Sequence, residues 1–168
     1  MRTLIVGGVG SGKTTLAKYL SDFFDRPYFS IDSIVYDDNN KKRDEESQKK
    51  IANKINRENK DYIIEGVLRD NLDFLLNVCD EIIFLDYPSN IKLKRIKLRY
   101  FKQRIGLEKC DYVPNKEMYN NMIKWNKEFN REKLMNKLSK YSKKLLIVRN
   151  DKELKVYYKY LEKNKFYL

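Results

Sequence analysis

A short apolar run near the N-terminus, followed at once by a glycine-rich loop and an amphipathic stretch, constrains this chain more than any other feature. The run Thr3-Leu4-Ile5-Val6 is apolar and largely β-branched, which is typical of a buried parallel strand. Residues 7–14, Gly-Gly-Val-Gly-Ser-Gly-Lys-Thr, fit the pattern G-x-x-x-x-G-K-[ST]. Residues 16–24 then place Leu and Phe at helical spacing. A strand, this loop and a helix in that order predict a phosphate-binding loop.

The residue types in the loop suit a nucleoside triphosphate. Glycines let successive backbone N–H groups face phosphate oxygens, and the N-terminus of the following helix adds partial positive charge. We expect Lys13 to reach the β- and γ-phosphates, the Thr14 hydroxyl to ligate Mg²⁺, and Thr15 to hydrogen-bond an inner phosphate. The predicted cofactors are therefore ATP and Mg²⁺. The loop residues predicted to bind the nucleotide are Gly7, Gly8, Val9, Gly10, Ser11, Gly12, Lys13, Thr14 and Thr15.

The rest of the chain alternates apolar runs with helical patterns, which predicts an α/β fold built on a parallel sheet. A length of 168 residues is typical of one domain, and five strands with helices between them leave no room for a second. We therefore expect one domain over residues 1–168. The expected strands are residues 3–6, 28–31, 62–65, 81–85 and 144–148.

Composition excludes several classes of site. The chain has no His, which removes Ser-His-Asp and Cys-His mechanisms and His-ligated metal sites. Cys79 and Cys110 are too few for a disulfide scaffold or a four-cysteine zinc site. No apolar run approaches the roughly 20 residues of a membrane span, and no signal-peptide pattern opens the chain. We expect a soluble cytoplasmic protein with no membrane partner.

Charge is distributed unevenly along the chain. Residues 1–90 hold 13 Lys and Arg against 16 Asp and Glu, whereas residues 91–168 hold 23 against 8. The resulting charges of −3 and +15 suggest that the second half meets an anion, either nucleotide phosphates or nucleic acid. Compositional drift explains the asymmetry equally well, since 26 Lys and 16 Asn beside 13 Tyr are typical of an AT-rich coding sequence.

Two further stretches carry a family resemblance. Together with the phosphate loop, IIEGVLRD at 63–70 and DEIIFLDYPSNIKLKRIKLR at 80–99 resemble the small adenylate-kinase-like nucleotide kinases. The chain is most similar to the bacterial family of DNA topology modulation proteins. This resemblance implies a three-layer α/β/α P-loop fold with strand order 2-3-1-4-5. It also implies an acceptor-binding insert at about 32–60 and a helical lid at about 100–131, which has only Cys110 and therefore no zinc staple.

The same resemblance suggests roles on the acceptor side. Glu65 would act through Mg²⁺ and its waters, and Arg69, four residues later, would hold the acceptor. Asp86 competes with Glu65 as the Mg²⁺-assisting carboxylate, because each acid follows an apolar strand; the Gly and Arg after Glu65 favour the latter. Asp32 lies where related small-molecule kinases place an acid that faces the acceptor hydroxyl, as base or orienter. The alternative for Asp32 is an N-cap of a helix that starts near Ser33.

On the nucleotide side, the resemblance places Arg95 over the adenine and Arg99 on the transferring phosphate. These two residues share one helix face, being i and i+4, although Lys92, Lys94 and Lys97 beside them are equally typical of a solvated basic face. Two residues after the last strand, Arg149 and Asn150, fall at the adenine edge of similar kinases.

A break in a helical stripe singles out one more arginine. Met118, Met122, Trp125 and Phe129 follow helical spacing through the expected helical region, a pattern that is more often core than site. The stripe stops near residues 130–131, which predicts a bend from which Arg131 would swing onto phosphates.

The function that these features favour is an ATP-dependent phosphotransferase. It would move the γ-phosphoryl group of MgATP to a small acceptor, such as a nucleoside or nucleotide, with Lys13, Glu65, Arg99 and Arg131 as catalytic residues. The chain lacks an Asn-Lys-x-Asp guanine motif, which disfavours GTP. The alternative is a regulatory ATP-binding protein associated with nucleic acid. In either case we expect weak, sequence-independent nucleic-acid binding.

Overall fold

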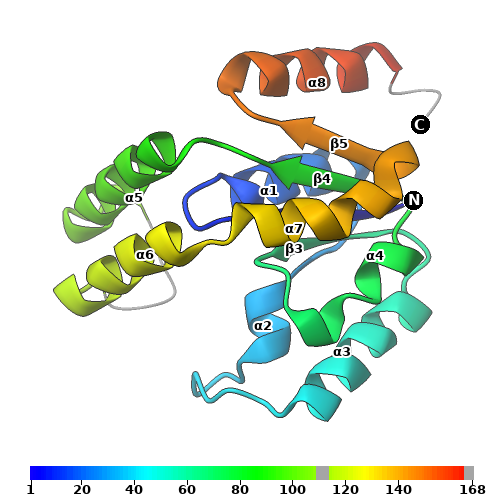
Figure 1. Cartoon of the computed structure of the whole chain (residues 1–168), viewed down its shortest axis with the longest axis horizontal. Coiled ribbons are helices and arrows are strands. Elements are labelled where there is room, and N and C mark those ends of the chain that lie inside the picture. Colours follow the sequence, from blue (N-terminus) through cyan, green and yellow to red (C-terminus); the bar gives the residue numbers. More distant parts are fainter. Residues whose placement is uncertain (109–113, 165–168) are drawn as a thin grey trace.

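The computed structural model describes residues 1–108 and 114–164. Within these ranges five parallel strands form one sheet in the order β2-β3-β1-β4-β5, which confirms the predicted fold class (Figure 1). Because β1 pairs with β3 on one side and β4 on the other, the carboxyl ends of both neighbours flank the loop that follows β1. The strands are β1 (Arg2–Gly7), β2 (Tyr28–Ser30), β3 (Tyr62–Gly66), β4 (Glu81–Leu85) and β5 (Leu145–Val148).

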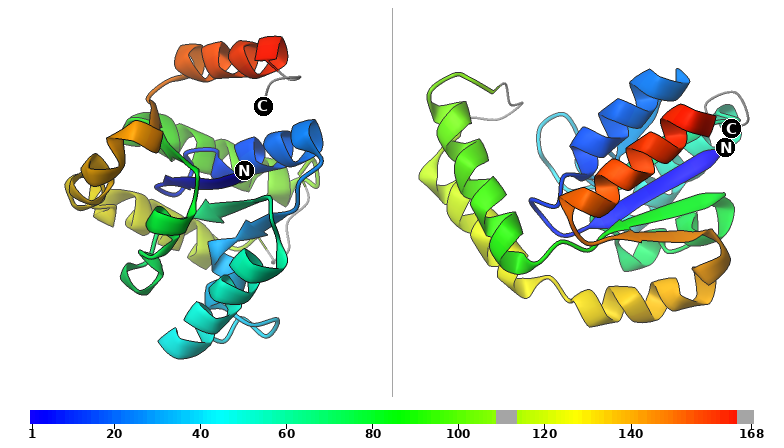
Figure 2. Two further views of the ribbon diagram at one scale, coloured as in Figure 1. Left: turned by 90° about the vertical axis from the view of Figure 1, so that its right-hand side faces the viewer. Right: turned by 90° about the horizontal axis from the view of Figure 1, so that it is seen from above.

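Helices pack on both faces of this sheet and give three layers (Figures 1 and 2). Alternation along β1 explains the two cores: Ile5 belongs to one apolar cluster, whereas Leu4 and Val6 belong to the other. The face of Ile5 is covered by α1 (Lys13–Phe24) and α8 (Asp151–Asn164). The opposite face is covered by α2 (Ile31–Val35), α3 (Glu45–Glu58), α4 (Leu75–Val78) and α7 (Arg131–Leu138), with the short 3-10 turns η1 (Asp70–Leu72) and η2 (Ser139–Lys144) beside them.

Two helices project from the carboxyl edge of the sheet as an arm. Helices α5 (Ser89–Arg104) and α6 (Lys116–Glu128) lie side by side (Figures 1 and 2). The rings of Tyr100 and Tyr119 stack between them with centroids 4.7 Å apart. The segment predicted as the lid, about residues 100–131, takes in the end of α5, all of α6 and the first residue of α7; residues 109–113, and Cys110 with them, lie outside the described residues.

The break predicted near residue 130 is present, but the apolar stripe of α6 is not a core face. Helix α6 ends at Glu128, and the Asn130 side chain caps α7 by accepting from Lys133 N at 2.8 Å. Trp125 is 47% exposed, whereas the buried residue of α6 is Asn126, at 3%. Phe129, the last residue of the stripe, packs against the apolar cluster of Leu4 and Val6, so the stripe meets the core only where α6 ends.

The acceptor-side insert has more order than its polar sequence indicated. Residue 31, expected at the end of a strand, instead begins α2, and Ser30 caps this helix by accepting from Asp32 N at 3.1 Å. The Arg43 guanidinium donates to the carbonyl oxygens of Ser33, Ile34 and Tyr36, which satisfies the last turn of α2. Across the described ranges, no helix combines the length and apolar character that crossing a membrane requires.

Candidate active site

The loop between β1 and α1 has the geometry expected of a phosphate-binding loop. Gly10 has φ +79° and Gly12 has φ +96°, a left-handed conformation that residues with a Cβ rarely adopt. Gly12 is the N-cap of α1, so the free N–H groups of the first helical turn face the loop. The sequence therefore folds here into an anion-binding cradle.

Lys13 is buried at the base of this cradle. Its side chain is 9% exposed, and its Nζ donates to the carbonyl oxygen of Gly8 at 2.9 Å. Burial lowers the pKa of Lys13, and the carboxylates of Glu65 and Asp32 partly oppose that shift. Three groups predicted to act together thus lie within electrostatic range of one another.

Glu65 faces the loop from the end of β3. Thr14 Oγ1 donates to Glu65 Oε1 at 3.0 Å, and the Glu65 side chain is buried. Burial raises the pKa of Glu65, while Lys13 and the Thr14 hydroxyl act in the opposite direction. A hydroxyl and a carboxylate are hard oxygen donors of the kind that Mg²⁺ prefers, so these two residues fit the predicted metal.

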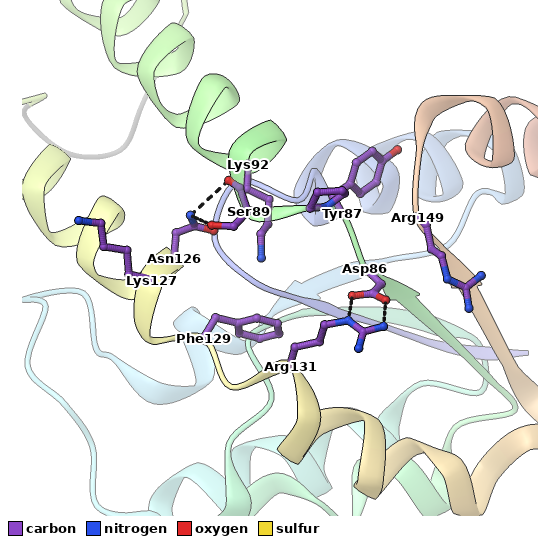
Figure 3. Close-up of a pocket in the computed structure, with 10 residues that line it drawn as sticks. Asp86, Tyr87, Ser89, Lys92, Asn126, Lys127, Phe129, Arg131 and Arg149 are labelled. Carbon is purple, nitrogen blue, oxygen red and sulfur yellow. Dashed lines mark hydrogen bonds and ion pairs between the residues drawn. The ribbon is translucent and has the colours of Figure 1, made fainter.

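Asp86, the competing acid, is bound by the first residue of α7. Its carboxylate accepts from Arg131 Nε at 2.8 Å and from Arg131 Nη2 at 2.6 Å, a bidentate pair that Figure 3 shows in full. The Asp86 side chain is 6% exposed. The structure therefore brings Thr14 to Glu65 and Arg131 to Asp86.

Arg95 is held against the loop, whereas Arg99 lies further out along α5. The Arg95 guanidinium lies over the Tyr87 ring, 4.1 Å from its centroid, and donates to Ser11 O at 3.0 Å and to Asp151 Oδ1 at 2.6 Å. Arg99 is half exposed and forms an ion pair with Glu108 at 3.1 Å.

Arg99 is nevertheless in electrostatic range of the loop. Beside burial and the carboxylates, its charge contributes to the lowered pKa of Lys13. The Arg99 side chain is therefore placed between the solvated face and the site.

The remaining predicted residues lie around the cleft with fewer contacts. Asp32 is exposed in the first turn of α2; since Ser30 caps that helix, the alternative role of Asp32 as its N-cap is not observed. Arg69 is exposed, and its side chain makes no hydrogen bond or ion pair within the described part of the chain. The Asn150 side chain is committed to α8, because it accepts from Glu153 N at 3.0 Å.

A pocket of about 410 Å³ opens beside the phosphate loop, at the carboxyl end of β4 (Figure 3). Arg149 and Arg131 both line it, as do Lys92 and Asn126. Asn126 Nδ2 donates to Ser89 Oγ at 2.8 Å, whereas its Oδ1 is buried with no partner in the described residues. The pocket is thus lined by several cations around one carboxylate, that of Asp86.

Lys92 and Asn126 were not predicted as site residues from the sequence. Lys92 was grouped with a solvated basic face, yet it is 5% exposed, while Lys94 and Lys97 are exposed as expected. Burial lowers the pKa of Lys92, and Asp86 opposes the shift. Its spacing from Ile96, which is buried on the same helix face, was the one available indication.

Comparisons with known proteins agree with this architecture. No family profile matches the chain. The uncharacterized protein YqaC of Bacillus subtilis (strain 168) is 29% identical over 122 residues, which cover 72% of this chain and 68% of that protein.

Solved kinase structures share the fold at low sequence identity. Deoxyadenosine kinase from M. mycoides, with bound dATP, has a TM-score of 0.51 at 14% identity and covers 96% of this chain and 99% of its own. Shikimate kinase from Bacteroides thetaiotaomicron has a TM-score of 0.54 at 16% identity, with 97% of both chains covered. Shikimate kinase from Aquifex aeolicus has a TM-score of 0.51 at 16% identity and covers 100% of each chain.

These likenesses show the fold. The chain shares its three-layer α/β/α fold with these kinases. The narrower resemblance to the DNA topology modulation proteins stays a prediction.

Proposed function

We propose that this protein is an ATP-dependent phosphotransferase that moves the γ-phosphoryl group of MgATP to a small acceptor. The observation that carries the proposal is the convergence on one loop of a buried lysine, a hydroxyl–carboxylate pair and the arginines of the arm. Lys13 Nζ binds Gly8 O, and Thr14 binds Glu65, at the edge of the sheet where the α5–α6 arm begins. Phosphoryl transfer depends mainly on positioning and on neutralising charge at phosphate oxygens, which is what this set of groups supplies.

Thr14 and Glu65 are the proposed holders of Mg²⁺, the carboxylate partly through water. The ion would neutralise charge on the β- and γ-phosphate oxygens when bound. The Thr14 hydroxyl is placed by the first turn of α1 and the Glu65 carboxylate by the end of β3, so both donors come from rigid elements.

Arg99 and Arg131 are the proposed partners of the transferring phosphoryl group. Arg131 reaches a phosphate only when its bidentate pair with Asp86 opens, so a rearrangement of the arm or of α7 belongs to the catalytic cycle. Arg95 holds the loop to α5 through Ser11 O and would present its guanidinium to the base.

The acceptor side is proposed to lie between α2 and the segment after β3. Asp32 and Arg69 are exposed there, the first as base or orienter of a hydroxyl and the second as a charge for a phosphate or polar group. A nucleoside or nucleotide is the proposed class of acceptor; one neighbour of the same fold is a deoxyadenosine kinase and two are shikimate kinases.

The test is ADP release from MgATP across a panel of nucleosides, nucleotides and small hydroxy acids. A no-acceptor reaction measures background ATP hydrolysis, and a Lys13→Met variant controls for contaminating kinases. We expect one acceptor class to raise ADP release well above both controls. Release that no acceptor stimulates would contradict the proposal.

A second candidate is a regulatory nucleic-acid-associated protein of the topology modulation kind, favoured by the +15 charge of residues 91–168. The test is a DNA titration at about 50 and 200 mM salt, with and without MgATP. Weak binding that falls steeply with salt is expected from lysine-rich surfaces. Tight, sequence-selective binding that survives the higher salt and ignores ATP would favour this candidate over the kinase.

A further inference from the structure

A second buried lysine lies against the phosphate loop. Lys92, in the first turns of α5, is 5% exposed, and its side chain extends toward Phe129 and the loop (Figure 3). A Cβ built on Gly8 would lie 3.0 Å from Lys92 Nζ and 3.2 Å from the Phe129 ring. Gly8 is also the residue whose carbonyl oxygen accepts from Lys13 Nζ. Two ammonium groups that are 79 positions apart therefore gather at one glycine.

The Lys92 ammonium has no anionic partner of its own. Within the described residues it makes no hydrogen bond and no ion pair. The Lys92 Nζ lies over the Phe129 ring, 4.7 Å from the ring centroid. Asp86 is in electrostatic range, but both of its oxygens are bound by Arg131. A buried charge without a partner is costly, so such groups in proteins are paired or meet a ligand.

The surroundings of Lys92 favour an anion as that ligand. The pocket beside it is lined by Lys92, Arg131 and Arg149 with Asp86 as the opposing acid. Two of its lining residues, Lys92 and Phe129, lie against Gly8 of the loop. The positive charge of Lys92 is also among the causes that lower the pKa of Lys13, after burial. Both lysines are thus close enough to act on one group.

We propose that Lys92 is a second phosphate-binding lysine, which binds the terminal phosphoryl group of the nucleotide from the α5 side of the loop. This inference rests on the proposed function. Lys13 approaches the triphosphate from α1 and Lys92 from α5, so the γ-phosphate lies between the two ammonium groups. Phe129 is a positioning residue, since its ring lies against Nζ and holds the ammonium beside Gly8 of the loop.

Gly8 has a defined place in this arrangement. A methyl group at this position would press on both Nζ of Lys92 and the Phe129 ring, each closer than ordinary contact. The absence of a side chain at Gly8 therefore leaves room for the Lys92 ammonium and the Phe129 ring beside the loop.

The experiment compares binding of MgADP with that of the magnesium complex of the β,γ-imido analogue of ATP, by calorimetry. Lys92→Met keeps the aliphatic stem and removes the charge, and Lys92→Gln is measured beside it so that the result does not depend on one variant folding. The matched control is Lys94→Met, which removes the same charge from an exposed position on the same helix. Thermal unfolding of each variant checks the fold.

We expect both Lys92 variants to bind the imido analogue about 10–100-fold more weakly, the usual effect of losing one charge-assisted hydrogen bond. Affinity for ADP should change by less than about threefold, and Lys94→Met should change neither. A merely structural role would weaken both nucleotides alike.

Two results separate the inference from the function on which it rests. If the wild-type protein binds both nucleotides and the Lys92 variants lose both equally or neither, the role of Lys92 is overturned and the proposed function stands. If the wild-type protein binds neither nucleotide, the proposed function fails and this inference fails with it.

Discussion

The two strands that flank β1 end in the same way in sequence and in different ways in space. On the β3 side, the Glu65 carboxylate accepts from Thr14 and lies in range of Lys13, so it belongs to the phosphate loop. On the β4 side, the Asp86 carboxylate is bound on both oxygens by Arg131, so it is tied to the start of α7. Each acid follows a buried apolar strand, and each is nearly buried itself.

The difference suggests different roles for Glu65 and Asp86 around the loop. A carboxylate that accepts a hydrogen bond from a hydroxyl can give up that bond when a metal ion binds between the two groups, because both groups are ligands of Mg²⁺. An acid held bidentately by arginine already has its charge neutralised, and we propose that Asp86 keeps Arg131 close to the nucleotide site until that pair opens. The β3 side is therefore proposed to hold the metal, and the β4 side to hold the mobile cations.

The largest effect is expected at Lys13, which lies at the base of the phosphate loop between the two flanking strands. Lys13→Met should abolish detectable MgATP binding, because it removes the charge at the base of the cradle, while leaving the fold intact. Calorimetry measures the affinity, and circular dichroism with thermal unfolding checks the fold. Near wild-type ATP affinity would refute the assignment of the phosphate loop.

The two acids provide the direct test of the comparison. Glu65→Gln should lower kcat about 10³-fold and raise the Mg²⁺ concentration needed for activity, because a metal ion contributes several kcal/mol to transition-state stabilisation. Asp86→Asn should leave the Mg²⁺ dependence close to wild type, since its partner is Arg131. Steady-state rates over a Mg²⁺ titration measure both variants. The opposite pattern would assign the metal to the β4 side.

A smaller effect is expected at Arg99. Arg99→Ala should lower kcat about 10²–10³-fold with little change in ATP affinity, because its interaction would form mainly as charge develops in the transition state. Single-turnover rates and equilibrium binding separate the two quantities. A change in KM alone, or none, would place Arg99 on the solvated face of α5.

The pH dependence of activity should report Glu65. Burial raises the pKa of this carboxyl, so it takes up a proton at a higher pH than an ordinary Glu. Mg²⁺ needs the ionised form. We therefore expect kcat/KM to have its full value above that raised pKa and to fall as the pH falls through it. A profile of kcat/KM against pH at fixed Mg²⁺ tests this expectation. The acid limb should be absent from the residual activity of Glu65→Gln.

The smallest effect concerns the ion pairs between α7 and η1, which cover the same face of the sheet. Asp70 binds Lys133 at 2.8 Å and Lys137 at 2.6 Å, and hydrogen bonds from these lysines lower the pKa of Asp70 to about 2 from the usual value of 3.8. The stability that this pair adds is present above that usual value and is lost as the pH falls toward 2.

Asp70→Asn should therefore lower the melting temperature by about 1–3 °C at neutral pH, because exposed ion pairs contribute little. Thermal unfolding at pH 7 and at about pH 2.5 measures the difference, which should shrink at the lower pH. Phosphoryl transfer should stay at the wild-type rate. A large loss of activity would mean that this anchor also positions Arg131.

The sequence by itself determined the parts of the protein that depend on neighbouring residues. The loop of residues 7–14 needs only its own glycines and the two elements beside it, and the alternation of apolar runs was enough to predict the parallel sheet. The strand order came from the family resemblance and not from the alternation. The bend before Arg131 was also predicted, because a helical stripe that stops is a local feature.

Only the tertiary structure decided the partners of the charged residues. Thr14 and Glu65 are 51 positions apart, and Asp86 and Arg131 are 45 apart, so no local pattern could say which acid meets the hydroxyl and which the arginine. Lys92 and Lys94 are two positions apart in the sequence, yet Lys92 is buried against the phosphate loop and Lys94 is exposed. Burial and pairing depend on which surfaces meet after folding. The free energy of a charged side chain depends on how far it is desolvated and on which charges lie near it. The sequence pattern of α5 alone therefore could not distinguish a solvated lysine from one that faces the site.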